Sequence, residues 1–149
     1  MNYLNKSESA QRRDERDRQL TELHCEIYDK LRKRRVKNLR KVALTIALAT
    51  GSPRYHVGFD RAYVVIPKLL ERSDSVAFKS STTRDMWVDL AMKVQYIMAH
   101  GKISIAQALN IVLEQCRASR FFLTEQHAWV IIKRTLSRMN CRAPYGRVA

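Results

Sequence analysis

The segment SPRYHVGFDRAYVVIPKLLER, residues 52–72, has a close counterpart in ASRFFLTEQHAWVIIKRTLSR, residues 118–138. The two segments align without a gap at a constant spacing of 66 residues. The match is more specific than the period that any two amphipathic helices share, so it predicts an internal duplication. The identical pairs are Arg54/Arg120, Ala62/Ala128, Val64/Val130, Ile66/Ile132, Leu70/Leu136 and Arg72/Arg138.

At the same spacing of 66 residues, apolar positions further upstream also align with one another. This spacing pairs Leu20 with Met86 and Ile46 with Val112, although residue identity is lost there. A shared helical period explains this upstream agreement as well as a duplication does. A unit of about 66 residues is too small to be comfortably stable alone, so we expect two units to pack around a common core, with pseudo-twofold symmetry.

Helical periodicity dominates the rest of the chain, and four glycines and three prolines supply few turn signals for a sheet. The sequence therefore predicts an all-α, compact six-helix protein. We expect an N-terminal three-helix unit at 1–72, a linker at 73–83, a C-terminal three-helix unit at 84–139 and a basic tail at 140–149. The expected helices cover 9–37, 39–50, 58–72, 84–100, 105–117 and 125–139.

Several residues predict where these helices begin, bend and end. Thr83, Ser104 and Thr124 are candidate N-caps, because their hydroxyl oxygens can accept from the first free amides of a helix. Gly101 is expected to end the fourth helix. Pro67 is expected to kink or divide the third, because it lacks an amide hydrogen and its ring clashes with the preceding turn.

The net charge of +14 and the isoelectric point of about 10.2 exceed what solubility requires. Residues 1–41 and 117–149 each carry a net charge of +6, whereas residues 42–116 carry +2. Such an excess of positive charge attracts polyanions, so nucleic acid, either DNA or RNA, is the expected partner.

The densest charge lies in KLRKRRVKNLRK, residues 30–41, with eight basic residues in twelve and no acid. We expect it to contact phosphates without base preference, although a solvated helix end, a nuclear-localisation signal or a membrane-surface segment also fits. The residues predicted to bind nucleic acid are Lys30, Arg32, Lys33, Arg34, Arg35, Lys37, Arg40, Lys41, Arg54, Arg61, Arg120, Gln126, His127, Lys133, Arg134, Arg138 and Arg142.

The second and third helices of each unit, joined by a short link, are loosely similar to a helix-turn-helix. In that arrangement Arg61, Gln126 and His127, early in the third and sixth helices, would face base edges. Alternatively the link aromatics Tyr55 and Phe121 anchor the links to the core. Arg54 and Arg120 then either cap the preceding helix or contact phosphate.

No motif in the chain predicts catalysis. P-loop, GxGxxG, HExxH and nucleophile-elbow patterns are absent, and the four histidines are isolated from one another. The three cysteines have no zinc-binding spacing. We therefore expect a non-enzymatic protein without cofactor, metal or small-molecule substrate.

The longest apolar run, residues 42–49, is too short to cross a bilayer, and the N-terminus lacks an export signal. We expect no membrane partner and a location that is cytoplasmic and reducing, or inside a virus particle.

These observations predict a small basic helical nucleic-acid-binding protein. The alternative is a structural or assembly protein, for instance a phage virion component or an adaptor, whose basic surface faces packaged nucleic acid or an acidic protein partner. A regulator that binds an acidic protein also fits, as does a protein of a mobile element. The sequence leaves open whether the chain forms a homo-oligomer or a larger assembly.

Overall fold

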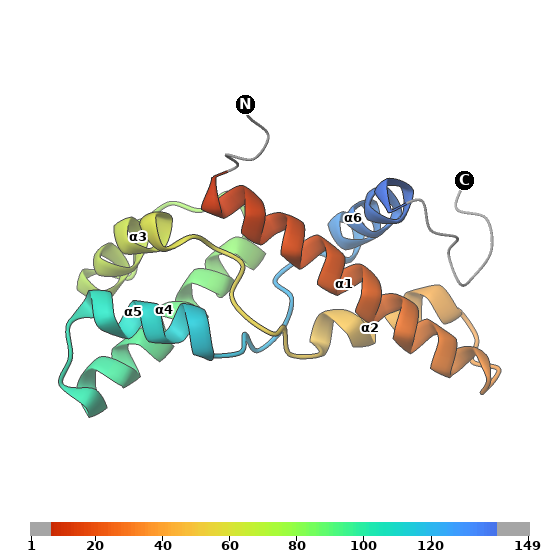
Figure 1. The fold of residues 1–149 in the computed structure, drawn as a ribbon, viewed down its shortest axis with the longest axis horizontal. Helices are drawn as coiled ribbons and strands as arrows, with labels where there is room; N and C mark the ends of the chain where they lie inside the picture. Colours follow the sequence, from red (N-terminus) through yellow and green to blue (C-terminus); the bar gives the residue numbers. More distant parts are fainter. Residues whose placement is uncertain (1–6, 140–149) are drawn as a thin grey trace.

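A computed structural model describes residues 7–139 of the 149-residue chain, and this part consists of six α-helices joined by loops. The predicted all-α, six-helix fold is confirmed (Figure 1). The helices are α1 (Glu8–Arg32), α2 (Leu39–Ala49), α3 (Phe59–Glu71), α4 (Ser81–Gly101), α5 (Ile105–Gln115) and α6 (Glu125–Arg138).

Two of the three predicted N-caps are confirmed. Ser104 and Gln107 form a reciprocal capping box at α5, and the Thr124 hydroxyl accepts from the His127 amide at α6. The prediction for α4 is wrong, because the helix begins earlier and the Ser80 hydroxyl accepts from the Thr83 amide. Ser80 has an extended backbone, which is the conformation that an N-cap requires.

Two predicted helix ends are also corrected. α1 ends at Arg32 rather than at residue 37, because Arg35 and Asn38 take positive φ angles of 53° and turn the chain. Gly101 remains within α4, and Lys102 takes the left-handed conformation after it, with φ of 51°.

α3 is continuous through Pro67, so the predicted division is wrong. The carbonyl that loses its partner belongs to Tyr63, which is 44% exposed, so solvent can satisfy it. Ile66 and Leu69 on either side of the proline are buried and hold the helix against the core.

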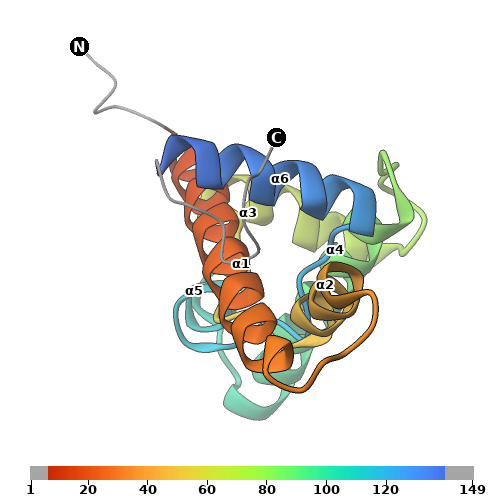
Figure 2. The ribbon, with the colours of Figure 1, turned by 90° about the vertical axis from the view of Figure 1, so that its right-hand side faces the viewer.

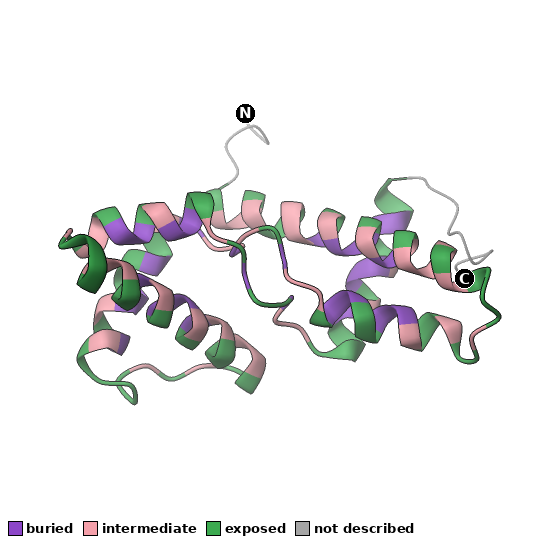
Figure 3. Cartoon of the chain, turned by 90° about the horizontal axis from the view of Figure 1, so that it is seen from below, coloured by how far each residue is buried: buried purple, intermediate pink, exposed green. Residues whose placement is uncertain are grey.

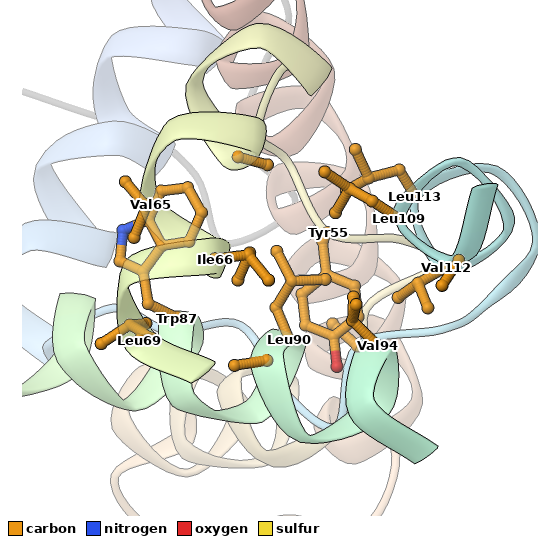
Figure 4. Close-up of a cluster of buried hydrophobic side chains, with 14 residues drawn as sticks. Tyr55, Val65, Ile66, Leu69, Trp87, Leu90, Val94, Leu109, Val112 and Leu113 are labelled. Atoms are coloured by element: carbon orange, nitrogen blue, oxygen red, sulfur yellow. The ribbon is translucent and has the colours of Figure 1, made fainter. Parts of the chain in front are cut away.

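The buried side chains form two clusters rather than the expected common core. One joins α3, α4 and α5 around Tyr55, which lies among Leu90, Val94, Leu109 and Leu113 (Figure 4). The other joins α1, α2 and α6 (Figure 2), and Phe121 is one of its buried members. Each cluster therefore combines the first two helices of one predicted unit with the third helix of the other. The domain boundaries themselves stay a prediction.

The links that precede α3 and α6 meet between the two clusters (Figures 1 and 3). Ser52 and Ala118 form an isolated antiparallel bridge there, in which the Ala118 amide donates to the Ser52 carbonyl at 3.0 Å. Arg117 donates to the Gly51 carbonyl at 2.9 Å. The approach is close, because a Cβ at Gly51 would lie 3.2 Å from the Ala118 oxygen.

The bridge joins two residues that are 66 positions apart, which is the spacing of the sequence match. The bounds of α2 and α5 differ by the same 66 residues, and so do the first residues of α3 and α6. These agreements fit the predicted duplication, which stays a prediction.

Within residues 7–139, every helix is either too short or too polar to span a bilayer.

Candidate nucleic-acid interface

A groove of about 550 Å³ lies where the two links meet. It is lined by the N-terminal half of α1, by both links, and by residues at or near the starts of α3, α4 and α6. No aspartate or glutamate is among the described residues that line it. Apart from His56, its basic side chains are Arg13, Arg16, Arg54, Arg61, Lys79, Arg120 and His127.

The groove has an apolar floor and a charged rim. Tyr55, Ala118 and Phe121 are almost completely buried at the floor, whereas Arg61 and Arg120 belong to the exposed surface. Tyr55 donates a hydrogen bond to Asp89, and burial, followed by this bond, raises the pKa of the phenol. The floor is fixed by packing, so the rim presents its cations from a rigid base.

The lining residues occur in pairs separated by 66 positions. Eight pairs, one member from each half of the chain, account for sixteen of the lining residues. The pairs are Arg13/Lys79, Arg16/Thr82, Ser52/Ala118, Arg54/Arg120, Tyr55/Phe121, His56/Phe122, Val57/Leu123 and Arg61/His127.

Several of the groove cations keep their charge uncompensated. Arg13, Arg61 and Lys79 form no ion pair within residues 7–139. Arg16 and Arg120 each contact one carboxylate, at 2.8 Å from Asp17 and 3.1 Å from Asp85 respectively. Positive charge therefore exceeds negative charge on the rim, and the concave shape concentrates its field.

Arg54 and Arg120 have different surroundings despite their equivalent positions. Arg54 lies 3.3 Å from Glu114 and 3.6 Å from Glu15, and it donates to the Leu113 carbonyl at 3.4 Å near the end of α5. This arrangement favours the capping interpretation for Arg54, although the capped helix is α5 rather than the preceding α2. The Arg120 guanidinium instead lies 5.0 Å from the centre of the Phe122 ring.

His56 forms part of the groove wall and is held neutral at pH 7. Its ring stacks on Phe121 at 6.2 Å between centroids, and its Nε2 lies 2.6 Å from the Gln19 Oε1. Burial, followed by repulsion from Arg16 and Arg12, lowers the pKa of His56 to about 4. Because the amide oxygen accepts, the neutral imidazole carries its hydrogen on Nε2.

The cluster at residues 30–41 lies outside the groove, at the end of α1, in the following turn and at the start of α2. Lys30 pairs with Glu26 at 3.1 Å, Arg32 pairs with Asp29 at 2.8 Å, and Arg40 lies over the Trp129 ring. Its other basic side chains are exposed and form no ion pair within the described residues. They are Lys33, Arg34, Arg35, Lys37 and Lys41.

The basic residues of α6 beyond its first turn do not join the groove. Arg134 lies 3.5 Å from Asp17 of α1, and Arg138 lines a pocket that also contains Asp14 and Asp17. The charge of Arg134 is thus partly compensated within the protein, whereas Arg138 forms no ion pair within residues 7–139. Lys133 is half-buried, Gln126 is exposed but is not among the groove residues, and Arg142 lies outside the described residues.

The structure therefore brings together four of the predicted binding residues, Arg54, Arg61, Arg120 and His127, and adds three that sequence reasoning missed. The added cations are Arg13, Arg16 and Lys79. A signal for two of them existed, because Arg13 and Lys79 are basic residues separated by 66 positions.

Two further features bear on what the groove can do. Within the described residues no three histidine, cysteine, aspartate or glutamate side chains are grouped to hold a metal ion. α2 shares its core cluster with α6 rather than with α3, so the packing expected of a helix-turn-helix pair is not seen there.

In comparisons with known proteins, no family model, curated protein or solved structure matches the chain.

Proposed function

We propose that this protein binds nucleic acid through the groove and has no catalytic activity. The observation that carries the proposal is the convergence of seven basic side chains from distant parts of the chain, without a lining carboxylate among the described residues. Like charges held together repel one another, so an anion that neutralises them would be bound favourably.

The chemistry of the rim favours phosphate. Arginine binds phosphate oxygens with two parallel hydrogen bonds, and Arg13, Arg61 and Arg120 present guanidinium groups at the groove. Arg61 and His127 lie in the first turns of α3 and α6, where the helix dipole also favours an anion. Phosphate contacts position a protein on nucleic acid without reading its sequence.

The test is the binding of the full chain to random-sequence nucleic acid over a salt series. Each phosphate contact is expected to contribute about −0.9 to the slope of log affinity against log salt for duplex DNA. We expect a steep slope that becomes shallower by about 3.6 when Arg13, Arg61, Lys79 and Arg120 are replaced by glutamine. A slope near zero, or no binding at low salt, would contradict the proposal.

A second candidate function, a structural or assembly protein, is favoured by one observation on α4. Val88, Met92 and Tyr96 are spaced by four residues and are 37%, 65% and 63% exposed, so they form an apolar stripe on the surface. A defined oligomer of the purified chain, lost on substitution of Met92→Lys and Tyr96→Lys, would support assembly. A monomer in solution would count against self-assembly.

A further inference from the structure

We propose that the groove is a site for double-stranded nucleic acid, in which equivalent residues from the two halves of the chain contact the two antiparallel backbones. This inference rests on the proposed function and deepens it, because it selects the duplex over the single strand as the ligand.

The two links that line the groove meet about a local twofold axis. An antiparallel bridge relates its two residues by such an axis, and here the bridge joins Ser52 to Ala118, 66 positions later. The pairs Arg13/Lys79 and Arg61/His127 have the same spacing and line the same groove. The rim thus carries basic residues in matched pairs about the bridge.

A duplex has the symmetry that such a site requires. Its two strands run antiparallel, and twofold symmetry in DNA-binding proteins mirrors the symmetry of the duplex. If a phosphate of one strand meets Arg13 and Arg61, the twofold axis brings a phosphate of the other strand to Lys79 and His127. A single strand has one polarity, so the two halves of the groove would meet different chemical groups along it.

The aromatic faces of the groove are already covered, which disfavours a single strand. Proteins that bind single strands without sequence preference stack the bases on aromatic side chains. Tyr55, Trp87 and Phe121 line the groove but are 1%, 4% and 3% exposed. The Phe122 ring is covered on one face by Arg120. The groove therefore offers cations for a backbone and little free aromatic surface for bases.

The two sides of the groove are not chemically identical. One side has two arginines, Arg13 and Arg61, whereas the other has Lys79 and His127. Arginine can bind phosphate through two hydrogen bonds, whereas the lysine ammonium acts as a point charge. We therefore expect the arginine side to contribute more to duplex affinity, with a measurable contribution from the other side.

The experiment compares three double variants with the unaltered chain, each tested on a random-sequence DNA duplex and on its separated strands at the same salt concentration. The variants are R13Q/R61Q, K79Q/H127Q and the control K68Q/K102Q. The control replaces two exposed lysines that do not line the groove.

We expect the unaltered chain to bind the duplex at least about 10-fold more tightly than either strand. R13Q/R61Q should weaken duplex binding by about 10-fold or more and K79Q/H127Q by about 3–10-fold, whereas the control should change it by less than about 3-fold.

Different outcomes distinguish the two claims. Equal or tighter binding to single strands, or no effect of K79Q/H127Q on duplex binding, would overturn the duplex inference and leave nucleic-acid binding standing. Absence of binding to the duplex and to both strands would overturn the proposed function itself. Circular dichroism of each variant checks that it keeps the helical fold.

Discussion

The protein has two strongly basic regions, and they are built in opposite ways. The cluster at residues 30–41 comes from one continuous segment that runs from the end of α1 through the turn into the start of α2. The groove draws seven basic side chains from segments between residues 13 and 127. The cluster is conspicuous in the sequence, whereas the groove exists only in the folded chain.

Dense charge along the sequence and convergent charge in space are therefore different properties. In the cluster, Lys30 and Arg32 pair with Glu26 and Asp29, whereas most of its other exposed cations have no ion pair within the described residues, so ion pairing alone does not distinguish the two regions. The groove cations Arg13, Arg61 and Lys79 have no ion pair within the described part of the chain and surround a concave surface. A concave site focuses the field and limits the orientation of a ligand, which an exposed helix end cannot do.

The largest expected effect is a loss of stability when a buried side chain at the floor of the groove is truncated. Phe121 is 3% exposed within the cluster of α1, α2 and α6, so Phe121→Ala should lower the free energy of unfolding by about 3–5 kcal/mol. Urea denaturation followed by circular dichroism measures this. The matched variant Phe122→Ala, at a half-buried neighbour, should cost less. Equal losses would show that Phe121 does not anchor the link.

The second prediction compares how much each of the two basic regions contributes to duplex affinity. Replacing Arg13, Arg61, Lys79 and Arg120 by glutamine should weaken duplex binding by about 100-fold at moderate salt. Replacing Lys33, Arg34, Arg35 and Lys37 removes the same charge and should weaken it by about 10-fold or less, because an exposed segment holds phosphates loosely. Titrations monitored by fluorescence anisotropy measure both.

The equal change in net charge makes the second variant a control for long-range attraction. If the cluster variant lost more affinity than the groove variant, the cluster rather than the groove would be the principal interface.

The third prediction concerns the pH dependence of stability. The groove contributes to it through His56, whereas residues 30–41 contain no histidine. The folded-state pKa of His56, about 4, lies below the ordinary histidine value of about 6.5. As the pH falls from about 6.5 to 4, His56 is therefore protonated in the unfolded chain but stays neutral in the folded chain. Stability should be highest above this window and fall by up to about 2 kcal/mol between pH 7 and 5.

Denaturation midpoints measured across this pH range check the expectation. His56→Gln should remove part of the pH dependence of stability. The rest of this dependence is expected from His24, whose pKa is also lowered by burial. An unchanged dependence in His56→Gln would contradict the assignment.

The smallest effect is expected from removing the carboxylates that pair with the cluster. Glu26→Gln with Asp29→Asn breaks the ion pairs of Lys30 and Arg32, so duplex affinity should rise by about 2–3-fold with little change in stability. The same anisotropy titrations measure the rise. A rise as large as the loss in the groove variant would show that the cluster contributes equally.

Helix content could be predicted from the sequence because apolar spacing and caps are local properties. Ser104 and Thr124 cap the helices that their position indicated. Pro67 did not divide α3, because buried neighbours on both sides outweigh its missing hydrogen bond. The turn at Arg35 and Asn38 was missed because Arg35 carries no turn signal, although asparagine is a residue that adopts the left-handed conformation.

The site was harder to predict because it depends on which helices pack together. The match between 52–72 and 118–138 indicated equivalent positions, but it did not indicate that α3 would pack with α4 and α5. That pairing places the two links side by side and brings Arg61 and His127 into one groove. Arg13 and Lys79 were missed because each is an ordinary basic residue in its own segment.

The most direct test of the groove as the principal interface is lysine acylation footprinting of the unaltered protein, with and without a saturating DNA duplex, read by mass spectrometry. Lys79 in the groove and Lys33 and Lys37 in the cluster are all exposed, so each reacts in the free protein. We predict strong protection of Lys79 by the duplex and weaker protection of Lys33 and Lys37. Protection of Lys33 and Lys37 with Lys79 still reactive would contradict binding in the groove.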